Sequence, residues 1–173
     1  KTLHACLKTL LTETAAAHAG SWFAWGQHRF GIILPGMEPE TARALAGRIQ
    51  GELALRHVET VSIGISPFPL QDFDPGQSLV NACKALDHGA FFGPNACVSF
   101  DAVSLNISGD RYYQAADLDG AMHEYRMALV LDQTNVNARN SLGVCLAEKG
   151  EADLARLEFE AACRNAPDDA LAL

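Results

Sequence analysis

The 173-residue sequence lacks any apolar run that approaches the roughly 20 residues a membrane-spanning helix needs. It also lacks a cluster of lysine and arginine side chains, and its formal charge is −8. Without a basic patch, a protein cannot displace counterions from nucleic-acid phosphates or be drawn electrostatically to an anionic lipid surface. These absences exclude membrane insertion within this segment and disfavour nucleic acid as a partner.

Metal-binding and disulfide spacings are absent as well. The five cysteines contain no CxxC pair, and the six histidines show no HxxxH or HExxH spacing. We therefore predict reduced thiols in a cytoplasmic protein, with no metal and no cofactor. The apolar fraction of 49% is too high for a disordered chain and is sufficient for a packed core.

The composition changes near Asp101. Before it, apolar runs of strand length alternate with helical segments, whereas the residues after it are almost all helical in pattern and rich in Ala, Leu, Glu and Arg. The first part holds 7 basic and 9 acidic residues and the second holds 6 and 12, so the second carries −6 of the total −8. We predict an α+β domain over residues 1–101 and an all-α segment over residues 102–173.

Hydrophobic periodicity predicts the elements of the first domain. Within 59–66, Gly64 is expected to mark a close approach of a neighbouring backbone. The predicted helices cover 1–17, 38–56 and 78–89, the predicted hairpin pairs 21–25 with 30–34, and the remaining strands cover 59–66 and 96–100.

Three separated motifs in this domain resemble those of GGDEF domains, the diguanylate cyclases that condense two GTP into cyclic di-GMP. The hairpin turn reads GQHRF over Gly26–Phe30, the strand reads TVSIGI over Thr60–Ile65, and ACKALD is followed by Gly93, Pro94 and Asn95. The resemblance implies a partial ferredoxin-like nucleotide-cyclase palm in a bacterial signalling protein. The family's first strand and helix have no counterpart here.

The turn departs from the family where catalysis depends on it. The family has Gly, then Asp or Glu, then Glu, where this chain has Gln27, His28 and Arg29. Mg²⁺ on a triphosphate prefers carboxylate oxygens. A fixed cation about 5 Å from a divalent ion, at an effective dielectric near 20, is unfavourable by roughly 6 kcal/mol before screening. The degenerate turn comprises Gly26, Gln27, His28, Arg29 and Phe30.

Other positions at which the family has charged residues are also replaced in this chain. Ala90 stands where the family has a phosphate-binding Lys, and Pro94 stands where it has Arg. The inhibitory RxxD motif falls on residues 17–20, which read AHAG. We predict that the domain is not an enzyme. The absent central strand is expected to leave unpaired ladder groups between the hairpin and residues 59–66, which suits a fragment of a longer protein or a gap closed in another way.

The second part repeats with a period of 34 residues, the spacing of tetratricopeptide (TPR) repeats. We predict repeats over 102–135 and 136–169, with residues 170–173 opening a third helix pair. Pro167 ends the second repeat, whereas Gln133 stands at that position in the first. The aligned pairs are Gly109 with Gly143, Tyr112 with Leu146, Ala121 with Ala155, Tyr125 with Phe159 and Ala128 with Ala162.

The concave face of such repeats commonly holds a peptide or protein segment. Its positions in this chain carry no Lys or Arg, which disfavours a clamp for an acidic carboxy-terminal peptide. The alternative is that these helices only cap the first domain. The predicted face comprises Asn106, Asp110, Tyr113, Asn137, Asn140, Val144 and Glu148.

Two functions are compatible with the sequence. The first is a non-catalytic signalling or scaffold protein in which the TPR face recruits a partner. The second is a metal-independent sensor of a guanine nucleotide or cyclic di-GMP, in which His28 and Arg29 contact phosphate. A further partner consistent with the resemblance is another GGDEF domain.

Overall fold

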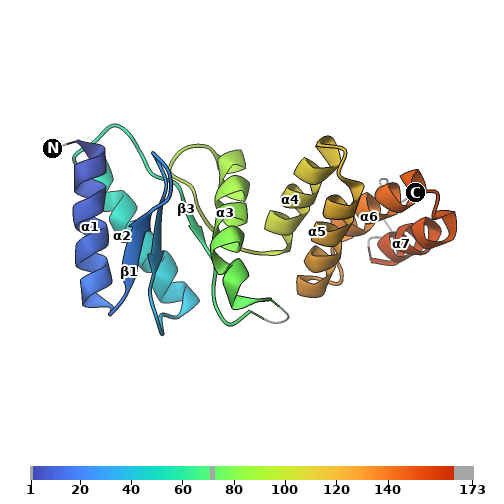
Figure 1. Ribbon diagram of the computed structural model, residues 1–173, viewed down its shortest axis with the longest axis horizontal. Coiled ribbons are helices and arrows are strands. Elements are labelled where there is room, and N and C mark those ends of the chain that lie inside the picture. Colours follow the sequence, from blue (N-terminus) through green and yellow to red (C-terminus); the bar gives the residue numbers. More distant parts are fainter. Residues whose placement is uncertain (1, 71–72, 166–173) are drawn as a thin grey trace. The chain divides into compact units, whose positions relative to one another are not determined.

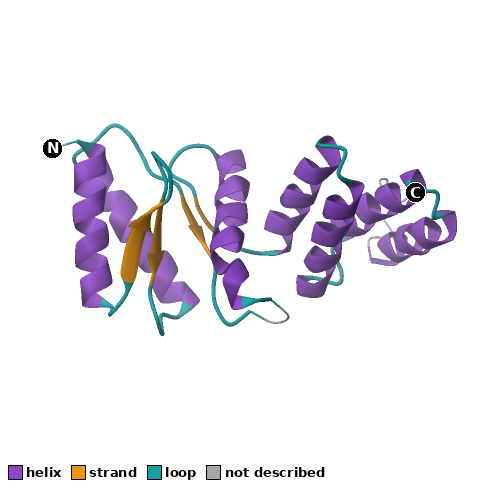
Figure 2. Ribbon diagram, viewed as in Figure 1, coloured by secondary structure: helices purple, strands orange, loops and turns teal. Residues whose placement is uncertain are grey.

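A computed structural model describes residues 2–70 and 73–165 (Figure 1). These residues are mostly helical and include two small sheets (Figure 2). Its contacts divide it into two compact units. Unit 1 takes the chain up to Phe68 together with Gly76–Ser99, and unit 2 takes Pro69–Pro75 together with the chain from Phe100 onward. Within the described ranges, no helix combines the length and the apolar character needed to span a bilayer.

Unit 1 contains the helices and the hairpin that the periodicity predicts. Short 3-10 turns, η1 over Pro75–Gln77 and η2 over Ala90–Phe92, precede and follow the third helix. The helices are α1 (Leu3–Ala17), α2 (Pro39–Ala54) and α3 (Ser78–Gly89), and the strands are β1 (Ser21–Ala24), β2 (Phe30–Ile33), β3 (Ile63–Ile65) and β4 (Cys97–Ser99).

The strand predicted over 59–66 is shorter in the structure, where only β3, Ile63–Ile65, is a strand. The physical reason is the buried side chain of Gln50 on α2. Its Nε2 donates to the backbone carbonyls of Val61 at 2.9 Å, Asn95 at 3.0 Å and Ala96 at 3.2 Å. The Val61 carbonyl is thus bound by a side-chain amide and not by a neighbouring strand. The Ala96 carbonyl also accepts from the Ile63 amide at 2.8 Å, and the parallel ladder starts there, with Ile63 opposite Cys97.

The four strands form two separate two-stranded sheets. β1 pairs antiparallel with β2, from Ser21 opposite Ile33 to Ala24 opposite Phe30, and β3 pairs parallel with β4. Among the described residues, no strand pairs with both sheets. α1 packs on the hairpin, whereas α2 and α3 pack on β3 and β4. The buried cluster of this unit comprises Cys6, Leu45, Ile49 and Leu53.

Gly64 confirms the predicted close approach of backbone to backbone. A Cβ built on Gly64 would lie 2.0 Å from the carbonyl oxygen of Ala82 and 2.6 Å from the amide nitrogen of Leu86. Both atoms belong to the α3 backbone, so a side chain at this position has no room. Glycine therefore lets β3 lie directly against α3.

Unit 2 is built from two helix pairs, α4 (Ala102–Gln114) with α5 (Leu118–Leu131) and α6 (Val136–Glu148) with α7 (Ala152–Asn165). Side-chain caps fix where three of the helices begin. Asp101 Oδ1 accepts from the Ser104 amide at 2.8 Å, Asp117 Oδ1 from Gly120 at 2.9 Å, and Asn135 Oδ1 from Ala138 at 3.0 Å. α5 also packs on α6, which joins the two pairs.

The two pairs pack in the same way, as the 34-residue period predicts. A Cβ on Gly109 would lie 2.4 Å from the Tyr125 ring, and a Cβ on Gly143 would lie 2.6 Å from the Phe159 ring. In each pair a glycine on the first helix thus receives an aromatic ring from the second. The aligned alanines Ala121, Ala128, Ala155 and Ala162 are all buried.

Tyr112 departs from the repeat. Its partner in the alignment, Leu146, is buried against α5, whereas Tyr112 is 42% exposed. The Tyr112 ring lies against Gly120 of α5, where an added Cβ would come within 2.7 Å of it, and the rest of the ring faces solvent. Pro167 and the third helix predicted from residue 170 lie outside the described residues.

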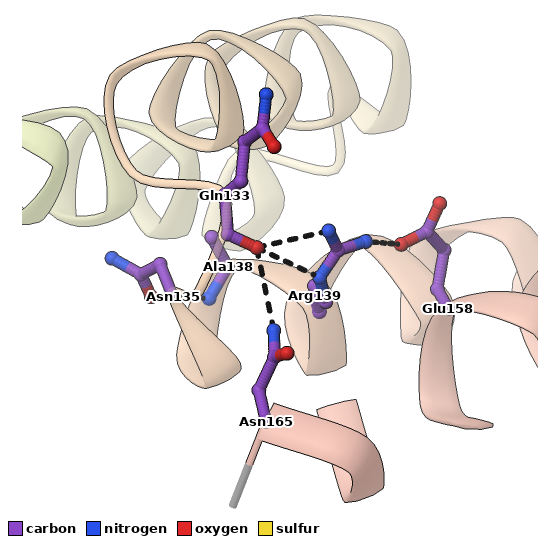
Figure 3. A network of polar contacts seen from close by, with 6 residues as sticks. All are labelled: Gln133, Asn135, Ala138, Arg139, Glu158 and Asn165. Carbon is purple, nitrogen blue, oxygen red and sulfur yellow. Dashed lines mark hydrogen bonds and ion pairs between the residues drawn. The ribbon is translucent and has the colours of Figure 1, made fainter. Parts of the chain in front are cut away.

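A polar network surrounds the backbone carbonyl of Gln133 in the turn before α6 (Figure 3). The Gln133 carbonyl oxygen accepts from Arg139 Nε at 3.3 Å, Arg139 Nη2 at 2.9 Å and Asn165 Nδ2 at 3.3 Å. Arg139 Nη1 also contacts Glu158 Oε2 at 2.9 Å. One guanidinium therefore ties the turn before α6 to α7.

Candidate functional site

The hairpin turn predicted as a degenerate active site is exposed. Gly26 adopts a φ of +77°, which suits glycine, and the Trp25 amide donates to the Arg29 carbonyl at 2.7 Å to close the turn. Gln27, His28 and Arg29 are all on the surface, and only Phe30 is partly buried, at the start of β2. The turn offers side chains to solvent and no enclosed pocket.

Basic groups from α1 surround the turn. The His4 ring lies 5.8 Å from the His28 ring and 5.2 Å from the Phe30 ring, centroid to centroid. Lys8 Nζ lies 6.0 Å from the Phe30 ring centroid. Burial raises the pKa of the Cys83 thiol, and the positive charge of Arg29 opposes that shift. The side chains that the turn itself contributes include no carboxylate, the ligand type that Mg²⁺ prefers.

The predicted concave face lies on α4 and α6. Its members recur at helical spacing, so each helix contributes one stripe. Tyr113, Asn137, Val144 and Glu148 are exposed, whereas Asn106, Asp110 and Asn140 are half-buried. Val103, which the sequence analysis did not include, is 44% exposed and lies one turn before Asn106 on the same stripe. Its signal was its place one helical turn before Asn106, whereas the other residues were selected by their positions in the TPR repeat.

Two tyrosine hydroxyls hold the two carboxylates of this face. The Tyr113 hydroxyl donates to Glu148 Oε1, which links α4 to α6. The Tyr125 hydroxyl donates to Asp110 Oδ1 at 2.8 Å, from α5 to α4. The hydrogen bond to Glu148 raises the pKa of Tyr113, and burial together with the bond to Asp110 raises the pKa of Tyr125 well above its usual range. Sequence reasoning missed both bonds because each joins different helices.

A hollow lies on α7, with a volume of about 630 Å³. Its lining includes Phe159, Cys163 and Arg156, which the 34-residue shift aligns with Tyr125, Leu129 and Met122 of α5. In the first pair these residues pack against α6. The hollow on α7 is therefore the repeat's helix-packing surface, and its shape follows from the repeat.

Comparison with known protein families matches residues 109–150 to the family described as TPR repeat. The match runs from the second half of α4 through α5 and α6, and it includes every predicted face residue except Asn106. It confirms that the second part of the chain contains a TPR repeat, whereas the predicted bounds of two repeats remain a prediction. A search of curated proteins finds no match.

Proposed function

We propose that this chain is a non-catalytic signalling or scaffold protein whose α4 and α6 face binds an extended segment of a protein partner. The observation that carries this proposal is the repeated pairing of Gly109 with Tyr125 and of Gly143 with Phe159, within a stretch that matches the TPR repeat. Proteins of this architecture use the face formed by the first helix of each pair for peptide and protein contacts. Here that face exposes apolar, amide and acid side chains together.

The proposal includes a first domain related to GGDEF domains that makes no cyclic di-GMP. What supports it is the predicted order of helices, hairpin and strands, together with the two unjoined sheets. The chemistry of the turn supports the loss of activity, because Arg29 and His28 replace the carboxylates and His4 lies close by. A turn of this charge repels the metal ion that the reaction requires.

Peptide binding is tested with Val144→Arg, which places a long charged side chain on α6 in the middle of the face. Peptides are first selected from a displayed library of random eight-residue sequences on the full chain. Their affinity is then expected to fall about tenfold or more in the variant, as for a central contact residue. The matched control is Leu154→Arg on α7, which is exposed to a similar extent. Equal loss in both variants, or no selected peptide at all, contradicts the proposed function.

The loss of cyclase activity is tested with the full chain, GTP and Mg²⁺. We expect no cyclic di-GMP above a protein-free control, because the turn provides no carboxylate for the metal. An active diguanylate cyclase assayed in parallel shows that the conditions support turnover. Formation of cyclic di-GMP by this chain contradicts the assignment, and stimulation of the added cyclase would indicate pairing with another GGDEF domain.

A second candidate function is a metal-independent nucleotide sensor. The observation that favours it is the gathering of His4, Lys8, His28 and Arg29 around one exposed turn. Guanidinium and imidazolium groups pair readily with phosphate oxygens. Calorimetry with GTP, GDP and cyclic di-GMP separates the candidates: a micromolar affinity that is lost on Arg29→Ala, and kept on Arg56→Ala, supports the sensor, and no heat with any of the three excludes it.

A further inference from the structure

Asp110 on α4 and Glu148 on α6 lie on the same part of the concave face. Tyr113 follows Asp110 by one helical turn, and its hydroxyl reaches Glu148 across the two helices. Both carboxylates also act on one buried neighbour: burial raises the pKa of the Cys145 thiol, and the charges of Glu148 and Asp110 raise it further. The two acids therefore form one negative region on the face.

Both carboxylates are held in place by neutral donors. Asp110 accepts from the Tyr125 hydroxyl and Glu148 accepts from the Tyr113 hydroxyl. Such bonds fix the position of a carboxylate without neutralising its charge. Within the described part of the chain, neither acid forms an ion pair.

Two basic side chains, one on α6 and one at its end, have partners outside the face. Arg139 of α6 pairs with Glu158 and with the Gln133 carbonyl, and Lys149 at the end of α6 pairs with Asp119 at 2.5 Å. The hydrogen bond and the charge of Lys149 lower the pKa of Asp119, and those of Asp119 raise the pKa of Lys149. The acids of the face therefore remain free to meet a charge supplied by a ligand.

The rest of the face suits an extended backbone with a long side chain. Asn106, Asn137 and Asn140 carry amides, which can both donate to and accept from peptide groups that an extended segment leaves unpaired. Asn106 Oδ1 is shielded from solvent and has no hydrogen-bond partner within the described structure. The exposed Val103 and Val144 offer apolar contact for the methylene groups of a Lys or Arg side chain.

From this arrangement we infer that the bound segment is an extended peptide with a Lys or Arg side chain placed at Asp110 and Glu148. The inference rests on the proposed peptide-binding function and specifies its ligand. Charge complementarity carries it: the acids of the face are unneutralised, and the part of the chain from residue 102 onward carries 6 basic against 12 acidic residues. An acidic segment is rejected by the same charges.

The test uses the full chain and the library of random eight-residue peptides described above. Selected peptides are expected to be enriched in Lys or Arg at one position. Glu148→Gln is expected to weaken the best basic peptide about two- to fivefold, the range for an exposed ion pair, and Asp110→Asn with Glu148→Gln about tenfold. Both substitutions keep a hydrogen-bond acceptor for the tyrosines. Glu160→Gln on α7, which removes one exposed carboxylate away from the face, is expected to leave the affinity unchanged.

The outcomes separate this inference from the proposed function. Selected peptides that bind α4 and α6, as shown by their loss on Val144→Arg, but that are neutral or acidic and insensitive to Glu148→Gln, overturn the inference and leave the proposed function standing. Basic peptides that Glu160→Gln weakens as much as Glu148→Gln does also overturn it, since the attraction would then come from net charge alone. An affinity that falls on raising the salt concentration, and falls less in the double variant, supports it.

Discussion

Tyr125→Ala is expected to lower the free energy of unfolding of unit 2 by about 4 kcal/mol, within the range for removing a buried aromatic ring. The Tyr125 side chain is 2% exposed, its ring covers Gly109, and its hydroxyl donates to Asp110. It also belongs to the cluster that joins α5 to α6 through Leu142, so its removal leaves a cavity between the two repeats. Because the same helices form the concave face, we expect peptide binding to be lost with the fold.

The measurement is urea unfolding followed by far-ultraviolet circular dichroism, with hydrogen exchange to locate the effect. Peptides from α4, α5 and α6 should lose protection. Tyr112→Ala is the comparison, because this tyrosine is 42% exposed and its ring lies against Gly120, so its removal should cost clearly less, about 1–2 kcal/mol. Tyr125→Phe keeps the ring and removes only the hydrogen bond, and should cost about 1 kcal/mol. A loss in Tyr125→Ala no larger than in Tyr112→Ala would contradict this account of the repeat.

The helices of unit 2 could be predicted from sequence because the same packing residues recur in both helix pairs. A single glycine or aromatic residue does not predict a helix pair. The common spacing of 34 residues between Gly109 and Gly143, and between Tyr125 and Phe159, predicts which helices pair and which side chains meet. The residues at the corresponding TPR positions of α4 and α6 then predict the concave face. Local rules of this kind need no knowledge of the tertiary structure.

The contacts that depend on tertiary structure could not be predicted. Gln50 on α2 donates to carbonyls of the segments before β3 and before β4, which lie far from it in sequence. No local sequence pattern predicts these hydrogen bonds. The hydroxyl bonds of Tyr113 and Tyr125 likewise join residues of different helices. The exposure of Tyr112, against the burial of its aligned partner Leu146, also depends on tertiary contacts that an alignment of repeats does not show.

The position of the hairpin turn could be predicted from its motif, but its neighbours could not. The sequence located the turn at Gly26–Phe30, and the structure places a hairpin there with the expected strands on either side. It did not predict that His4 and Lys8 of α1 would lie beside the turn, because the approach of α1 is a tertiary property. Those neighbours make the turn more basic, which is the basis of the nucleotide-sensor alternative.

The contact between β3 and α3 gives the second large expected effect. Gly64→Ala should lower the free energy of unfolding of unit 1 by about 3 kcal/mol, the upper end of the usual range for overpacking. The added Cβ would lie 2.0 Å from the Ala82 carbonyl oxygen, and because that atom is backbone the whole of α3 must move away.

The same substitution at Gly47 provides a control of opposite sign. Gly47 lies on the exposed side of α2, and a Cβ there would meet no atom within 4 Å. Gly47→Ala should therefore stabilise the helix by about 0.5–1 kcal/mol. Both tryptophans, Trp22 and Trp25, lie in β1 or directly after it, so tryptophan fluorescence during urea unfolding reports on unit 1. If Gly64→Ala and Gly47→Ala shifted the midpoint in the same direction, the direct packing of β3 on α3 would be wrong, and with it the reason for glycine in the TVSIGI strand.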